Sequence, residues 1–144
     1  MIEQDTIKLL RECDAGVKMG IDSIEQVKKH VESNEMRSML EKSHSLHERL
    51  DAEIQASLAR FHDSGKSPNP IAKGMSWLKT GMMLTMNESD KTIADLMTDG
   101  CNMGVKSLSE YLNKYKAADE LSKDIAKRLI EAECELAEGM RAYL

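Results

Sequence analysis

The prolines of this chain are confined to a single short segment, and this constrains the fold more than any other feature of the sequence. Both stand in SGKSPNP at residues 64–70, where glycine, serine and asparagine add further turn signals. Proline in a helix interior removes a hydrogen bond and clashes with the preceding turn. Because the rest of the chain lacks proline, long uninterrupted helices are possible on both sides of this loop.

Apolar residues recur at steps of three and four through those stretches, which is the pattern of a helix with one buried face. Serine, asparagine and aspartate at the breaks in the pattern supply helix caps. At 1.5 Å per residue, each of the longer stretches would form a helix of roughly 40 Å. We expect four long helices at about residues 3–32, 34–63, 89–116 and 119–143, and a short helix at 71–86.

The lengths of the connections predict how the helices are arranged. Two-residue links would join the first helix to the second and the last two helices to each other, which forces two antiparallel hairpins. A crossover at 64–88, which carries the short helix, joins the hairpins. We therefore expect one all-α domain over 1–144, a ferritin-like four-helix bundle with a long crossover. A plain up-and-down bundle with the short helix packed outside is the alternative.

Some segments of the chain also resemble a known family. They are LLRECDAGVKMGIDSIEQV, HSLHERLDAEI, IAKGMSWLKTGMML and TIADLMTDGCNMGVKSLSEYL. The most distinctive features are the glycine near the middle of the first helix and Trp77 with Lys79 in the crossover. On these motifs the chain resembles, over nearly its whole length, the uncharacterised ferritin-like proteins grouped as domain of unknown function DUF2383. The resemblance implies the bundle and no established activity.

A ferritin-like bundle invites a search for a di-iron site, which takes a Glu from each of two helices and a Glu-x-x-His from each of the other two. Glu41-x-x-His44 fits, but it belongs to a continuous polar face opposite the apolar stripe, which favours a solvated surface. The last helix carries Glu131-x-x-Cys134, with Cys where iron would need His. The usual ligand set is incomplete, so we expect no cofactor, with iron or another divalent metal as the alternative.

Polar residues on the buried stripes are more informative: His47 in the second helix, Glu133 in the last and Asp14 in the first. If the first and last helices run one way and the other two run the opposite way, His47 and Glu133 lie about 16 and 14 residues from the same end, hence at one height. An unpaired buried charge costs several kcal/mol, so we expect these two side chains to pair. Asp14 lies about six residues from that height. The pair is expected to fix the register of the helices; a single-metal site of His47, Glu133 and Asp14 is the alternative.

Glycines interrupt the middles of two long helices, as Gly16-x-x-x-Gly20 and Gly100-x-x-x-Gly104. Each costs about 1 kcal/mol relative to alanine in a helix. Close approach of the helix backbones would explain this cost. A small pocket beside His47 is the alternative.

The charge and motif content exclude several classes of function. A formal net charge of −5, with Lys and Arg interleaved with acids, disfavours binding to nucleic acid or to an anionic membrane. We find no run of roughly 20 apolar residues that could span a bilayer. The nucleophile elbow, the Walker sequence and the dinucleotide fingerprint are also missing from the sequence.

The cysteines indicate the compartment. Cys13, Cys101 and Cys134 are an odd number and far apart, which does not suit a disulfide framework, and the first residues lack the layout of a signal peptide. We expect a cytoplasmic protein in which all three cysteines are buried small apolar residues.

The short crossover helix carries more apolar surface than one side of a short helix can bury. Its large apolar residues include Trp77, Met82, Met83 and Met86. We therefore expect a non-catalytic structural or interaction module that forms a homo-oligomer through this apolar face. The alternative is a protein that binds iron, or another divalent ion, through His47 and Glu133.

Overall fold

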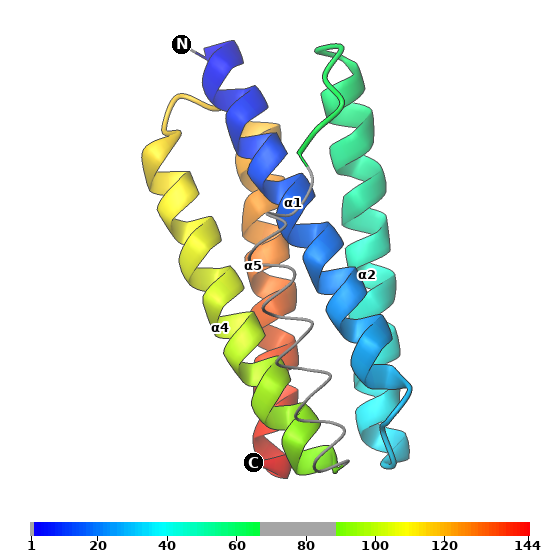
Figure 1. Ribbon diagram of the computed structural model, residues 1–144. Coiled ribbons are helices and arrows are strands. Elements are labelled where there is room, and N and C mark those ends of the chain that lie inside the picture. Colours follow the sequence, from blue (N-terminus) through cyan, green and yellow to red (C-terminus); the bar gives the residue numbers. More distant parts are fainter. Residues whose placement is uncertain (1, 67–88) are drawn as a thin grey trace.

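The computed structural model describes residues 2–66 and 89–144, whose regular structure is helical throughout (Figure 1). Its elements are α1 (Ile2–Lys28), α2 (Asn34–Ala59), α4 (Asp90–Lys114), α5 (Glu120–Met140) and the short 3₁₀ helix η1 (Arg141–Tyr143). The prediction of an all-α fold with four long helices is confirmed for these residues. The predicted short helix at 71–86 and the apolar face around Trp77, Met82, Met83 and Met86 lie outside the described residues.

The helices end earlier than predicted, and capping residues with non-helical backbone stand where α2 and α5 begin. Ser33 caps α2 with extended backbone (φ −69°, ψ 129°), and its hydroxyl accepts a hydrogen bond from the amide of Met36. Asp119 caps α5 in the same way, accepting from the amide of Ser122. The links between hairpin partners therefore span 29–33 and 115–119, and are longer than the two residues predicted.

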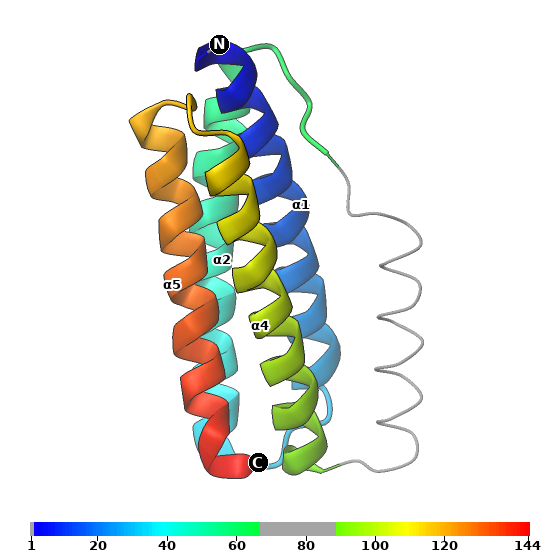
Figure 2. The ribbon, with the colours of Figure 1, turned by 90° about the vertical axis from the view of Figure 1, so that its left-hand side faces the viewer.

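The four helices form a bundle in which α1 and α5 run in one direction and α2 and α4 run in the other (Figures 1 and 2). Around the bundle, α1 packs on α2, α2 on α5, α5 on α4 and α4 on α1, and α1 also contacts α5 across the middle. Since α2 ends at the end of the bundle opposite to the start of α4, the chain between them must pass along the length of the bundle. These are the helix directions on which the height of His47 and Glu133 was predicted.

Each hairpin link is held by a helix of the other hairpin. Asp90, the first residue of α4, accepts hydrogen bonds from two backbone amides of the α1–α2 link at 2.9 and 3.0 Å. At the other end, Thr6 accepts from the amide of Asp119 at 2.8 Å and Asp5 from that of Ala117 at 3.1 Å. These bonds tie the two hairpins together at both ends.

The apolar core of the described residues consists of two separate clusters. One contains Leu9, Leu10, Cys13, Val17, Leu50, Ile54, Leu58, Leu108, Ala118, Ile125, Ala126 and Leu129. The other contains Ile24, Val27, Val31, Met36, Leu40, Ile93, Ala94, Met97, Cys101, Leu136 and Met140. On every long helix the residues of one cluster occupy one half and those of the other cluster occupy the other half, so the core is divided across the middle of the bundle.

Candidate functional site

The candidate site is the layer between the two apolar clusters, to which each long helix contributes. At this height α1 contributes Gly20, α2 His47, α4 Gly104 and α5 Glu133. We name this group the central layer. It places an imidazole and a carboxylate between the two apolar clusters, and a glycine on each of the other two helices.

His47 and Glu133 are in direct contact, as their heights predicted. Nε2 of His47 lies 3.1 Å from Oε1 of Glu133. The residues are 1% and 9% exposed. The prediction that they pair is therefore confirmed, and the pair joins α2 to α5 in the interior of the bundle.

The other ring nitrogen of His47 is also occupied. Nδ1 lies 2.8 Å from the backbone carbonyl oxygen of Ser43, one turn earlier in α2, and 3.4 Å from the hydroxyl of the same residue. A carbonyl oxygen can only accept, so the short contact requires a proton on Nδ1. The ring is thus held at both nitrogens.

The protonation of His47 follows from these contacts. Burial alone would lower the pKa of His47, but the hydrogen bond to Glu133, the negative charge of that carboxylate and the Ser43 carbonyl together raise it above its ordinary value. In its imidazolium form the ring donates from both nitrogens, to a carbonyl and to a carboxylate.

A thiol on α4 lies near this pair. Burial, followed by the negative charge of Glu133, raises the pKa of the Cys101 thiol, so the thiol stays protonated. Three helices, α2, α4 and α5, therefore bring a polar side chain to this part of the bundle.

The glycines of the central layer make room for this pair. A Cβ atom added at Gly20 would lie 2.7 Å from Cδ2 and 2.8 Å from Nε2 of His47. A Cβ atom at Gly104 would lie 3.4 Å from Cδ of Glu133. The α1 backbone rests directly on the imidazole, and the α4 backbone lies against the carboxylate.

The prediction of close approach does not hold for all four mid-helix glycines. A Cβ atom at Gly16 would make an ordinary contact of 4.0 Å with Leu129, and one at Gly100 would have nothing within 4 Å. Gly100 is exposed, so the prediction is wrong there: Gly100 lies on the side of α4 that faces away from the bundle. Clearance for the His47–Glu133 pair accounts for Gly20 and Gly104 only.

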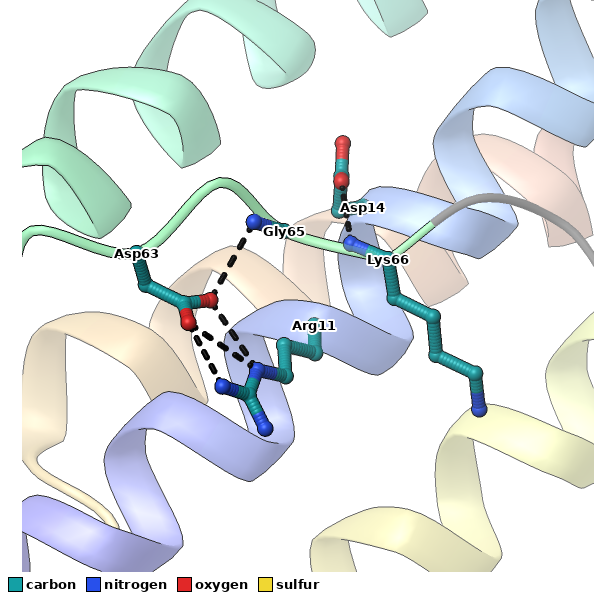
Figure 3. Close-up of polar contacts among 5 residues, drawn as sticks. All are labelled: Arg11, Asp14, Asp63, Gly65 and Lys66. Carbon is teal, nitrogen blue, oxygen red and sulfur yellow. Dashed lines mark hydrogen bonds and ion pairs between the residues drawn. The ribbon is translucent and has the colours of Figure 1, made fainter.

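Asp14 occupies a different site, where the chain after α2 returns to α1. Its carboxylate is fully buried and accepts from Lys18 Nζ at 2.9 Å, Gln55 Nε2 at 2.7 Å and the backbone amide of Lys66 at 2.9 Å. Gly65 has φ +85°, and a Cβ atom there would collide with the Asp14 carboxylate. Asp14 therefore anchors the start of the connection to α4 on the middle of α1 (Figure 3).

A second anchor lies one turn away on α1. Figure 3 shows the guanidinium of Arg11 facing the carboxylate of Asp63, with contacts of 2.6 Å from Nη2 to Oδ1 and 3.0 Å from Nε to Oδ2. Asp63 also accepts from the amide of Gly65 at 3.1 Å. The hydrogen bond from Arg11 keeps the pKa of the Asp63 carboxyl below its usual value. Nothing in the sequence pattern indicated these two anchors.

The structure does not assemble the three-residue metal site that was the alternative prediction. Among residues 2–66 and 89–144, no group of three or more His, Cys, Asp or Glu side chains could hold a metal ion. His47 and Glu133 are brought together, whereas Asp14 is held by Lys18, Gln55 and Lys66.

The Glu41-x-x-His44 element lies on the surface, as its polar face indicated. His44 contacts Glu25 at 3.1 Å and Glu48 at 2.7 Å through its two ring nitrogens. Glu41 is paired with Lys28 at 3.4 Å. The contacts with Glu25 and Lys28 join α2 to α1, the contact with Glu48 lies within α2, and together they do not form a ligand set.

The cysteines are only partly as predicted. Cys13 and Cys101 are buried free thiols, but Cys134 is exposed. Cys134 follows Glu133 on α5 and so lies about 100° around the helix from the buried face. Cys101 was expected near the height of His47 and Glu133, but the effect of Glu133 on its thiol was not predicted.

No protein-family model, curated protein or solved structure matches this chain. None of the helices in the described ranges is both long enough and apolar enough to cross a membrane.

Proposed function

We propose that this protein is a non-catalytic, ferritin-like helical bundle that serves as a structural or interaction module and associates with itself. The observation that carries the non-catalytic part is the central layer. There His47 and Glu133, at 1% and 9% exposure, face each other, and the second ring nitrogen of His47 faces the Ser43 carbonyl. Both ring nitrogens of His47 face acceptors of the protein itself, the Ser43 carbonyl and the Glu133 carboxylate, and this supports a role in joining helices.

The buried polar groups elsewhere support the same proposal. Among the described residues, Thr98 Oγ1 is the one buried side-chain polar atom without a hydrogen-bond partner. A ligand-binding interior would present several convergent polar groups. The polar groups of this interior serve to join helices.

The ferritin-like assignment is supported by the directions of the helices. Two antiparallel hairpins, with α2 and α4 parallel, require one connection that passes along the bundle. The cysteines, all free thiols, suit a reducing compartment such as the cytoplasm.

Self-association is proposed from the sequence of the crossover, whose apolar residues include Trp77, Met82, Met83 and Met86. The described helices, by contrast, expose few large apolar side chains: Ile2, Met103, Leu121 and Leu144. A contiguous apolar patch is the usual mark of an interface, and single exposed residues are not.

The test is metal analysis combined with light scattering on the full chain, purified without an affinity tag. We expect a dimer with far less than one equivalent of metal per chain. Met83→Glu should shift the dimer towards monomer, whereas the matched control Met103→Glu, at a side chain 69% exposed on α4, should not. A monomer at micromolar concentrations would overturn self-association. One or two equivalents of iron that are lost in His47→Ala would instead support the metal-binding alternative.

A further inference from the structure

Both ring nitrogens of His47 face hydrogen-bond acceptors, so the contact with Glu133 needs a proton on each nitrogen. A neutral imidazole carries only one of these two protons. Nδ1 faces the Ser43 carbonyl oxygen at 2.8 Å and Nε2 faces a carboxylate oxygen of Glu133 at 3.1 Å. Both are acceptors when the carboxylate is ionised. A neutral ring carries one N–H, so either tautomer leaves a nitrogen lone pair against an oxygen at hydrogen-bond distance.

Solvent and neighbouring donors do not relieve this conflict. His47 is 1% exposed, so water does not reach its ring nitrogens. The Ser43 hydroxyl is 3.4 Å from Nδ1, a long contact, while the carbonyl of the same residue remains at 2.8 Å. An unpaired buried acceptor loses its hydration without compensation.

We propose that the His47–Glu133 contact is a pH-sensitive element of the fold: one proton shared by the pair keeps the four helices packed at the central layer, and loss of that proton on the alkaline side loosens them. The proposal rests on the contacts of the central layer and does not depend on self-association or on the ferritin-like assignment.

The groups that face the pair determine which side chain changes its charge. From α4, Cys101 brings a thiol that burial and the charge of Glu133 keep protonated, while Gly104 brings no side chain. From α1, Gly20 also brings none. On α5, Cys134 lies beside Glu133 and raises the pKa of the Cys101 thiol further, which keeps that thiol neutral. On α2, Ser43 accepts from the ring. His47 is therefore the group that gains and loses the proton.

The sign of the effect follows from the direction of the shift. The pKa of His47 is raised in the folded protein above the ordinary value of 6.5. The stabilisation is then fully present below about 6.5 and is lost as the pH rises through the folded value. The pair is therefore sensitive to alkali, unlike a buried neutral histidine, which opens in acid.

Loss of the proton shared by His47 and Glu133 should weaken the packing of all four helices. His47 and Glu133 belong to α2 and α5, the α4 backbone at Gly104 lies against the carboxylate, and the α1 backbone at Gly20 rests on the ring with no side chain between. If the His47 ring moves away from Glu133, it either collides with the α1 backbone or leaves a gap between the ring and α1.

The experiment compares thermal unfolding of the full chain between pH 6 and 9.5 in the wild type, Glu133→Gln and the control Glu53→Gln. In Glu133→Gln the amide can donate to a neutral Nε2, so no extra proton is needed. We expect the melting temperature of the wild type to fall across this range and that of Glu133→Gln to fall less. Glu53 pairs with Arg128 on the surface at 2.7 Å, so its variant should follow the wild type.

A nuclear magnetic resonance titration of the wild type keeps the proposal testable if Glu133→Gln does not fold. The His47 ring signal, assigned by its absence in His47→Gln, should titrate with a midpoint above 6.5. Amide exchange at Gly20 and Gly104 should rise with the same midpoint, beyond the intrinsic increase with pH. A midpoint at or below 6.5, no added exchange at these glycines, or the same pH dependence in the wild type and Glu133→Gln would overturn the proposal.

Discussion

Replacing Gly20 with alanine tests the packing of the central layer most directly. The new methyl group would lie 2.7 Å from Cδ2 and 2.8 Å from Nε2 of His47, and 3.5 Å from Oε1 of Glu133. The imidazole cannot turn aside cheaply, because both of its nitrogens are hydrogen bonded and it is 1% exposed. Either the ring leaves Glu133 or α1 moves away from α2.

Opposing free-energy changes decide the result. Alanine favours the helix over glycine by about 1 kcal/mol, whereas overpacking a filled interior costs about 1–3 kcal/mol. Weakening a hydrogen bond to a charged group costs up to about 1.5–3 kcal/mol more. We expect Gly20→Ala to lower the free energy of unfolding by about 2 kcal/mol. With an unfolding entropy of about 2.1 cal/mol/K per residue, the melting temperature should fall by about 7 °C.

Two other mid-helix glycines serve as matched controls. A Cβ atom at Gly100 has nothing within 4 Å, and one at Gly16, a turn before Gly20 on the same helix, makes an ordinary contact of 4.0 Å. Both alanine variants should keep the gain in helix propensity and unfold up to about 3 °C above the wild type. Thermal unfolding followed by far-ultraviolet circular dichroism measures all three. The reasoning is refuted if Gly20→Ala is as stable as the wild type or as either control.

Two further predictions concern the buried polar contacts. Truncating His47 or Glu133 to alanine should each lower the free energy of unfolding by about 2–4 kcal/mol, because the partner is left buried and unpaired. The double variant should cost less than the sum of the two in urea denaturation, and strict additivity would contradict a direct interaction. Gly65→Ala should cost about 1–3 kcal/mol because of the positive φ and the collision with Asp14, and an unchanged denaturation midpoint would show that the anchor carries no stability.

The helices and their order could be predicted because they depend on local information. The apolar period and the position of the prolines are readable from the chain, and hairpin links restrict the sliding of adjacent helices to about one turn. This is why the heights of His47 and Glu133 were predictable. The helix boundaries were less predictable, because they depend on which of several adjacent polar residues becomes the capping residue. Ser33 and Asp119 are the capping residues of α2 and α5.

The side of a helix on which a residue lies was the hardest feature to predict from the sequence. Height alone suggested that Gly100 approaches another helix, but the side of α4 on which it lies is set by tertiary packing, and the residue is exposed. Cys134, next to a buried glutamate, faces outward for the same reason. The site of Asp14 was unpredictable for a different reason. Its partners include a backbone amide of the irregular segment that follows α2, whose path depends on the left-handed backbone of Gly65.

The anchoring of Lys66 on Asp14 also determines how much chain is left to complete the connection. Asp14 lies halfway along α1, so from there to the end of the bundle at Lys28 is about 21 Å at 1.5 Å per residue. Asp90 is fixed at that same end by the α1–α2 link. Residues 67–88 could reach about 70 Å if fully extended, at about 3.3 Å per residue. The fully extended length is some three times the distance along the axis between the two anchors, so the anchors themselves do not require a taut connection.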